Sequence, residues 1–216
     1  MLKIIFAEAI KSDQRKKLFP FPTEQKNIKA KINRYERELR KEYEVHQYID
    51  DSSGKRYLLG PFYLLLGDVD GALKSFAWFE QMFPDDMGEP FHTLCWALAL
   101  YRAGDMTGAS QKLLQTMLSN LYLLPQLLGH KQPRLDIWHG SNIEEKDYLE
   151  YIQPEIWTLW DTDALEWAQV KYESAEFERI RTRYIEIHSQ LKTEPVGTRR
   201  SQLVTEAFAL RKIKPG

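Results

Sequence analysis

Cysteine is almost missing from this chain of 216 residues, which has only Cys95. A disulfide framework within the chain is therefore excluded. Cys95 lies in the apolar run FHTLCWALAL, where we expect a buried thiol, because a catalytic thiolate needs an exposed, electropositive setting. Long apolar runs are missing as well. The N-terminal MLKIIFAEAIK is too short to span a membrane and shows no signal-cleavage pattern, so we expect a cytoplasmic protein without a membrane partner.

Glycine and proline are sparse, with 11 and 10 residues, and runs of β-branched residues are rare. Hydrophobic residues make up 43% of the chain and aromatic residues 12%, which is enough for a packed core. This composition favours helices over strands, and we expect an all-α fold.

Motifs for catalysis and for ligand binding are also missing. The five histidines form no HExxH or paired Cys/His spacing, and the loop with His130, Asp136 and His139 matches no zinc signature. The acidic cluster in residues 147–166 has no nucleophile or metal partner nearby. The turns GDVDG and GDMTG lack the lysine and the preceding strand of a phosphate-binding loop. We therefore predict no catalytic residue, no cofactor and no metal.

Charge is distributed unevenly along the chain. Residues 1–56 carry 14 Lys and Arg against 9 Asp and Glu, a net charge of +5. Residues 57–190 carry 10 against 20, a net charge of −10, and residues 191–216 carry 6 against 2, a net charge of +4. This pattern is compatible with a solvated surface, with ends that pack on the body, or with contacts between copies in a homo-oligomer. The pI of about 6.5 and the few aromatic residues in the basic segments argue against a nucleic-acid partner.

The N-terminal region, residues 1–52, is predicted to contain a short amphipathic helix and a long charged one. The first helix has its apolar face at Leu2, Ile5, Phe6, Ala9 and Ile10. The prolines in LFPFP at 18–22 end this pattern, and the second helix follows over 24–48.

Two segments of the central region share the skeleton xxxGDxxGA. They are LLLGDVDGA at 64–72 and YRAGDMTGA at 101–109, and they lie 37 residues apart. Internal repetition at this spacing is typical of helical solenoids. The pattern predicts helices at about 54–66, 69–83, 90–103 and 106–119, paired as two hairpins.

The first of these units resembles a tetratricopeptide repeat (TPR). Counted from Ser53 as the first position, the matching residues are Gly60 at position 8, Tyr63 at 11, Ala72 at 20, Phe76 at 24 and Pro84 at 32. Phe79 departs from the small residue that the family usually has at position 27. The second unit matches at Trp96, Ala97, Leu100, Ala109 and Leu113 and departs at Thr116 and Leu121. The resemblance implies a right-handed α-α superhelix of TPR-like hairpins.

A third, degenerate unit is predicted to complete the repeats at 53–152. It consists of a short helix in 121–129, a loop, and a helix over 141–152 capped by Ser141, with Glu144 three residues on. This tail is also similar, with less specificity, to suppressor-of-tumorigenicity and SEC-C-associated TPR-like proteins. Residues 153–216 are predicted to form C-terminal capping helices with a basic tail, beginning at Pro154 and with a last helix at about 199–212. We expect the three regions to form one compact domain.

The resemblance implies a non-catalytic scaffold or adaptor that binds an unidentified protein or peptide on the inner faces of the first helices. The candidate groove residues are Tyr57, Leu64, Phe91, Leu94, Leu98, Tyr101 and Arg102. The family's carboxylate clamp is absent, because its positions hold Tyr57, Pro61 and Cys95. Three alternatives stay open: the terminal helices fill this groove, the chain is a self-associating regulator such as the neutralising partner of a toxin, or it is an enzyme or a nucleic-acid binder.

Overall fold

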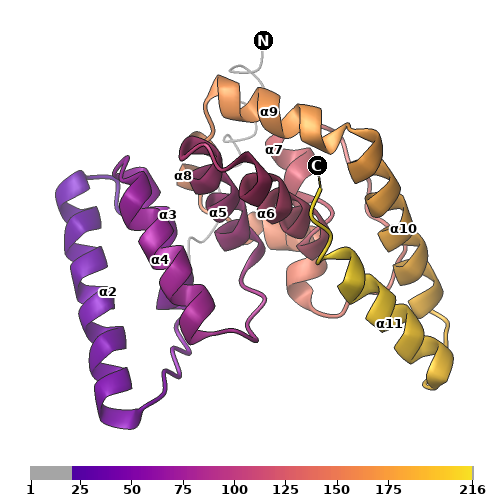
Figure 1. The fold of residues 1–216 in the computed structure, drawn as a ribbon, viewed down its shortest axis with the longest axis horizontal. Coiled ribbons are helices and arrows are strands. Elements are labelled where there is room, and N and C mark those ends of the chain that lie inside the picture. Colours follow the sequence, from indigo (N-terminus) through magenta and orange to yellow (C-terminus); the bar gives the residue numbers. More distant parts are fainter. Residues whose placement is uncertain (1–20, 216) are drawn as a thin grey trace.

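The computed structural model describes residues 21–215, and over that range the chain is helical, without a strand (Figure 1). The predicted all-α class is confirmed at this level. The helices are α2 (Gln25–His46), η1 (Lys55–Tyr57), α3 (Leu59–Leu65), α4 (Val69–Met82), α5 (Pro90–Arg102), α6 (Met106–Ser119), α7 (Leu123–Leu127), η2 (Asn142–Glu144), η3 (Lys146–Tyr151), α8 (Pro154–Thr158), α9 (Thr162–Tyr172), α10 (Ala175–Leu191) and α11 (Thr198–Leu210), where η marks a 3₁₀ helix. The short helix predicted near residues 2–10 lies outside the described residues.

The long helix α2 packs its apolar stripe on the first hairpin. Ile28, Ile32 and Leu39 are buried, while most of the charged residues around them face solvent. The hydroxyl of Tyr63 on α3 donates a hydrogen bond of 2.5 Å to the carboxylate of Glu36, which fixes α2 beside α3. The helix ends within two residues of the predicted boundary.

The shared GDxxGA skeleton is explained by the turn between the helices of each hairpin. In the first hairpin Gly67 has a φ of +75°, which favours glycine, and ends α3. Asp68 then caps α4, because its carboxylate accepts a hydrogen bond of 2.8 Å from the amide of Gly71. A Cβ at Gly71 would lie 2.5 Å from the ring of Tyr63 and 2.6 Å from an Asp68 carboxylate oxygen, so both the ring and the cap require glycine there.

The second hairpin repeats this arrangement. Gly104 has a φ of +81°, and Asp105 caps α6 through a hydrogen bond of 2.9 Å from the amide of Gly108. A Cβ at Gly108 would lie 2.4 Å from the Asp105 carboxylate. Each hairpin therefore begins its second helix with the same capping geometry, although the sequences between the shared positions differ.

The helices within the first hairpin pack closely at Gly60. A Cβ there would lie 2.4 Å from the ring of Phe76 on α4, so only glycine permits this approach. The ring of Phe76 stacks in turn on Trp96 of α5, with centroids 5.2 Å apart. The two hairpins thereby share one core, and the buried apolar residues from Phe21 to Ala207 form a single cluster.

The predicted α-helix over 141–152 is wrong, because this segment forms the two short 3₁₀ helices η2 and η3. The side chain of Asn120 donates to the carbonyls of Ile143 and Glu145 at 2.7 and 3.0 Å, which occupies acceptors that an α-helix would need. The Ser141 side chain makes no capping hydrogen bond, and Glu144 accepts from the amide of Gly140 instead. The predicted capping box is therefore not formed.

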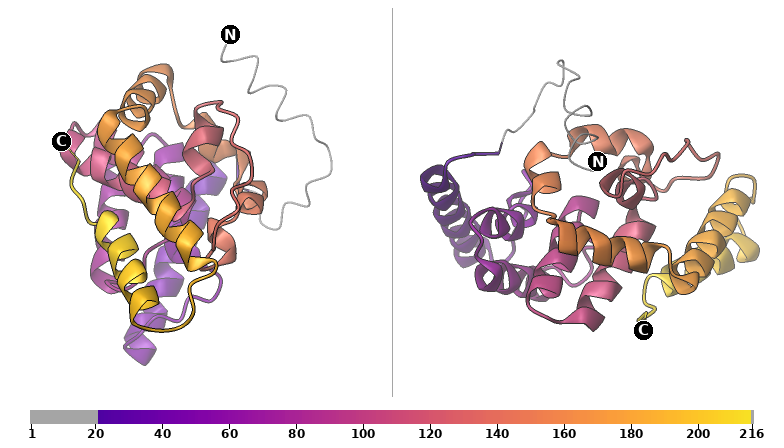
Figure 2. Two further views of the ribbon diagram at one scale, coloured as in Figure 1. Left: turned by 90° about the vertical axis from the view of Figure 1, so that its right-hand side faces the viewer. Right: turned by 90° about the horizontal axis from the view of Figure 1, so that it is seen from above.

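The C-terminal region is helical, as predicted. The helix that begins at Pro154 ends at Thr158, and Asp161 then starts α9 by accepting a hydrogen bond of 3.0 Å from the amide of Ala164. Helix α10 packs against α6, and α11 folds back on α10 (Figure 2). No helix within residues 21–215 has both the length and the apolar character to cross a membrane.

Candidate functional site

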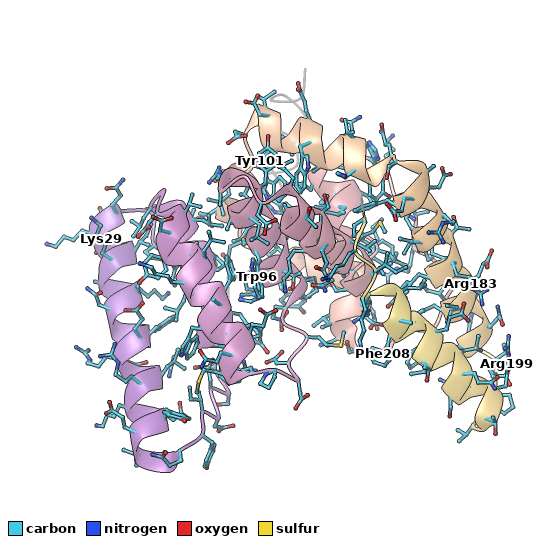
Figure 3. The ribbon with its side chains drawn as sticks, in the orientation of Figure 1. Lys29, Trp96, Tyr101, Arg183, Arg199 and Phe208 are labelled. Carbon is cyan, nitrogen blue, oxygen red and sulfur yellow. The ribbon has the colours of Figure 1, made fainter. Side chains whose placement is uncertain are left out.

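A groove of about 590 Å³ lies between α4 and α11, over α5 and α6. One side of the groove is lined by Phe79 and Glu80 of α4 and by Phe83, which directly follows this helix. The other side is lined by α11. In Figure 3, Trp96 and Phe208 lie on the sides of their helices that face the space between α4 and α11. The groove thus combines residues that are more than 100 positions apart in the chain.

The floor of the groove is an aromatic stack covered by a lysine. The Nζ atom of Lys112 lies 3.4 Å from the ring centroid of Trp96, whose ring is stacked on Phe76. Burial lowers the pKa of Lys112, and the carboxylate of Glu80, 3.4 Å from Nζ, works against this shift. The ammonium is held over the ring, and the floor is both apolar and positively charged.

The wall from α11 consists of Val204, Ala207, Phe208 and Arg211, which recur at the spacing of one helix face. Phe208 is 49% exposed, although it is a large apolar side chain.

Arg211 anchors this wall to the body of the protein. Its guanidinium donates hydrogen bonds of 2.7 Å to the Tyr184 hydroxyl and 3.1 Å to the Leu118 carbonyl, and it lies 3.5 Å from a carboxylate oxygen of Glu144. The position of α11 beside the groove is thereby fixed by contacts to α10, to α6 and to η2.

The opposite wall continues into the loop between α4 and α5, which is fixed by a polar cluster. The Tyr57 hydroxyl donates a hydrogen bond of 2.6 Å to Asp86, and the Arg56 guanidinium lies 3.0 Å from the same carboxylate. Burial works to raise the pKa of Asp86, but these two partners and the amide of Gly88 outweigh it and lower the pKa. The loop leaves the neighbouring Met87 55% exposed at the edge of the groove.

His92 lies beneath this loop in an aromatic cage. Its ring is within 5.0 Å of Phe76 and 4.6 Å of Phe79, centroid to centroid, and the side chain is 1% exposed. Burial, with a smaller contribution from Lys112, lowers the pKa of His92 to about 3. Its Nδ1 atom has no hydrogen-bond partner among the described residues. His92 is therefore neutral at physiological pH and acts as a packing group of the groove floor.

The residues predicted to line an inner groove do not line this one. Leu64, Leu94 and Leu98 are buried in the core, and Tyr57, Phe91, Tyr101 and Arg102 are half-buried.

Contacts within the chain cover much of that predicted face. The Tyr101 ring stacks on Trp167 with centroids 4.8 Å apart, and Arg102 donates a hydrogen bond of 2.5 Å to the Leu159 carbonyl. The amide of Phe91 donates to the Tyr148 hydroxyl at 3.5 Å. Residues 148–167 therefore lie over the face that was expected to receive a partner, as in the alternative that the chain itself fills this groove.

Sequence reasoning missed Met87, Phe208 and Arg211, which line the observed groove. The spacing of Val204, Phe208 and Arg211 on the last helix was the available signal. The loop with His130, Asp136 and His139 does not gather its members, and within residues 21–215 no group of three or more His, Cys, Asp or Glu is placed to hold a metal ion. Comparisons with protein-family models, with curated proteins and with solved structures find no match.

Proposed function

We propose that this protein is a non-catalytic interaction module that binds an amphipathic helix of a protein partner in the groove between α4 and α11. In this proposal α3–α4 and α5–α6 are TPR-like hairpins, α2 covers their N-terminal side, and α8 to α11 form the C-terminal cap. The observation that carries the proposal is the pair Met87 and Phe208, which are 55% and 49% exposed at the same apolar groove. Exposed apolar residues gathered in a concave site are typical of binding surfaces.

The two apolar residues belong to one continuous surface. Arg211 lies between them, with a guanidinium nitrogen 3.5 Å from the sulfur of Met87 and its central carbon 6.0 Å from the Phe208 ring centroid. Tyrosine, methionine and arginine are among the residue types enriched at interfaces. The groove therefore has an apolar surface with an arginine at its centre, which supports binding of a side-chain row from a partner.

The shape and rim of the groove favour a helix as the bound element. Helices form both long walls, and an apolar side-chain row at i, i+3, i+4 and i+7 fits between such walls. The α4 side of the rim carries Glu80 and Asp85, and the α11 side carries Arg211 and Lys212. A bound helix with basic residues on one flank and acidic residues on the other would match this rim, which also defines its orientation.

Three charged groups that line the groove are held in opposite-charge pairs. Lys112 lies beside Glu80, Arg211 beside Glu144, and Asp86 beside Arg56. These ion pairs hold the side chains that line the groove in place. This arrangement supports a role of the charged groups in binding rather than in proton transfer.

The test is a selection of helical peptides from a displayed library on the immobilised full-length chain. Selected peptides are then measured against the wild type, Phe208→Asp and the control Val170→Asp, which places the same charge on α9 at a residue 69% exposed outside the groove. We expect Phe208→Asp to weaken binding at least about tenfold and Val170→Asp to leave it unchanged. Selected peptides that bind all three proteins equally would refute the proposal, and so would a selection without binders.

A further inference from the structure

The side of α2 that faces away from the body is basic. Five cations of this helix are exposed and form no ion pair with another described residue, namely Lys26, Lys29, Arg37, Arg40 and Lys41. At about 100° per residue, they all lie within roughly 120° of one another around the helix axis. The outer face of α2 is therefore a row of positive charge that nothing described in the chain neutralises.

Most carboxylates of α2 lie on the other side of the helix, where contacts with the body hold them. Glu36 accepts a hydrogen bond from a tyrosine hydroxyl of α3, and Glu38 lies 3.2 Å from the Nζ atom of a lysine of η1. Glu42 accepts a hydrogen bond of 2.9 Å from the amide of Asp50. Within the helix only Glu44, near its C-terminal end, lies among the exposed cations. The charges of α2 are thus sorted by side, with most carboxylates inward and the cations outward.

Helix α9 carries an outer face of the opposite charge. Asp163, Glu166 and Val170 of this helix and Glu173 directly after it are exposed, and their spacing of three and four residues places them on one side. Val170 is 69% exposed and lies between the two glutamates. Glu173 is 3.8 Å from His130, and it remains exposed. The outer face of α9 therefore has an apolar centre flanked by carboxylates.

The two outer faces lie apart within one molecule. Figure 1 shows α2 at one edge of the molecule, with α3 and α4 between it and the helices that carry α9. Helix α2 packs against α3 and η1, whereas α9 packs against α10 and, through Trp167, on Tyr101 of α5. A contact between the two faces therefore needs two copies of the chain, and it joins them head to tail, because each copy contributes a different face.

The spacing of the charges fits an antiparallel contact centred on two small side chains. Ala30 is exposed among the cations of α2 and leaves room there for Val170 of another copy. In this register Glu166, four residues before Val170, comes opposite Arg34, four residues after Ala30, because both helices rise about 1.5 Å per residue. Arg34 lies 3.7 Å from Glu38, but this ion pair is at the surface and weak, so the arginine is available to a second carboxylate.

The same register aligns further charges on both sides of this centre. Asp163, seven residues before the centre on α9, comes opposite Arg37, seven residues after the centre on α2. Glu173, three residues after the centre, comes near Lys26, four residues before it. In the parallel direction Asp163 would face Thr23 instead of a cation. Charge complementarity therefore selects the antiparallel arrangement, and the net charges of +5 for residues 1–56 and −10 for residues 57–190 add attraction between copies.

We propose that copies of this chain associate through the outer face of α2 on one copy and the outer face of α9 on the next. None of the residues in this contact lines the groove between α4 and α11, so the groove stays open in the assembly. The inference is independent of the proposed function, and each can fail without the other. Because the charge pairs are at the surface, the association is weak and depends on ionic strength.

The first test is sedimentation of the full-length chain over a range of concentrations. At about 20 mM salt we expect the weight-average mass to rise with concentration above the 25.5 kDa of the monomer. At about 0.5 M salt the charges are screened within a few ångströms, and we expect the monomer mass to return. A wild type that stays monomeric up to about 0.5 mM at low salt would overturn the proposal.

The second test reverses the charges on each face. The basic-face variant combines Arg34→Glu with Arg37→Glu, and the acidic-face variant combines Asp163→Lys with Glu166→Lys. We expect each variant alone to be monomeric at low salt, because its two faces now carry the same sign. An equimolar mixture of the two should assemble again, since the reversed face of one variant is complementary to the reversed face of the other. This recovery also shows that both variants are folded.

A control variant separates the faces from the total charge. Lys74→Glu combined with Arg179→Glu changes the net charge as much as the basic-face variant does, at two exposed cations outside both faces. We expect this control to assemble like the wild type. Variants of both faces that assemble like the wild type would overturn the proposal, and so would a mixture of them that stays monomeric. A monomeric wild type that binds labelled duplex DNA through Arg34 and Arg37 would also overturn it, because the basic face would then belong to a phosphate backbone.

Discussion

Because His92 is buried in its neutral form, the stability of the fold depends on pH through this residue. Its pKa is lowered to about 3 by burial and, to a smaller extent, by Lys112, whereas the unfolded chain has the ordinary value of 6.5. Between these two values the unfolded state binds more protons than the folded state. The stability linked to His92 is therefore fully present above pH 6.5 and is lost as the pH falls towards 3.

We expect His92→Phe to make the free energy of unfolding less dependent on pH between 6.5 and 3. The wild type should lose up to about 1.4 kcal/mol more per pH unit than the variant, which corresponds to one additional proton taken up on unfolding. Urea unfolding at several pH values measures the difference. His188 is present in both proteins, and its pKa is lowered by burial as well, so its contribution cancels. Parallel pH profiles would contradict the buried, neutral state of His92.

Position 88, in the loop above His92, favours glycine both for its backbone conformation and for the space around it. Its φ is +74°, and a Cβ at this position would lie 3.3 Å from the Nδ1 atom of His92. Gly104 has a similar φ of +81°, but a Cβ there would have open space around it.

We expect Gly88→Ala to destabilise the protein by about 2 kcal/mol and Gly104→Ala by about 1 kcal/mol, because both carry the backbone cost and only the first adds a steric contact. Thermal or urea unfolding measures both variants. Equal losses of the free energy of unfolding in the two variants would show that the loop above His92 accommodates the added Cβ without an energetic cost.

At the scale of elements, the shared skeleton GDxxGA shows how far the sequence predicts local structure. The glycine–aspartate turn and the cap are encoded within five residues, and the predicted boundaries of α4, α5 and α6 agree with the structure to within one residue. The segment 141–152 shows the limit. Its capping-box pattern is local, but the carbonyls of Ile143 and Glu145 bond to Asn120, more than 20 residues away. A local pattern cannot reveal that competition.

The two caps provide a paired prediction. We expect Asp68→Ala and Asp105→Ala each to lower the free energy of unfolding by about 1 kcal/mol, since each leaves an amide of the first turn without its acceptor. A second substitution, Gly108→Ala, should be tolerated better in the Asp105→Ala background than in the wild type, because the carboxylate that the Cβ would meet is gone. Gly71→Ala should gain less from Asp68→Ala, because its Cβ would still meet the ring of Tyr63. Additive losses in unfolding experiments would contradict this reading of the motif.

At the scale of the whole molecule, the candidate site could not be predicted from the sequence. Five of the seven residues expected from the repeat resemblance to line a groove lie on α5, but the chain itself covers much of this helix through Trp167, Leu159 and Tyr148. The observed groove depends on contacts between the end of α11 and residues more than 90 positions earlier in the chain, such as the hydrogen bond from Arg211 to the Leu118 carbonyl. Helix faces are visible in the sequence, whereas the choice of which face is covered depends on tertiary contacts.

Two arginines near α11 test which contacts hold that wall. Arg211→Met removes the partner of Tyr184, Glu144 and the Leu118 carbonyl, and we expect a loss of about 2 kcal/mol because these groups are largely buried. Arg183→Met breaks an ion pair with Glu206 that also joins α10 to α11 but lies near the surface, and we expect a loss within about 1 kcal/mol. Urea unfolding of both variants measures the difference, and equal losses would contradict the anchoring role of Arg211.

The groove between α4 and α11 is proposed to bind an amphipathic helix of a partner. The most direct measurement is the dissociation constant of one library-selected helical peptide for the wild type, Phe208→Asp and Val170→Asp. We expect the affinity to fall at least about tenfold for Phe208→Asp and to stay unchanged for Val170→Asp, since only Phe208 of these two residues lines the groove. The same dissociation constant for all three proteins would contradict it.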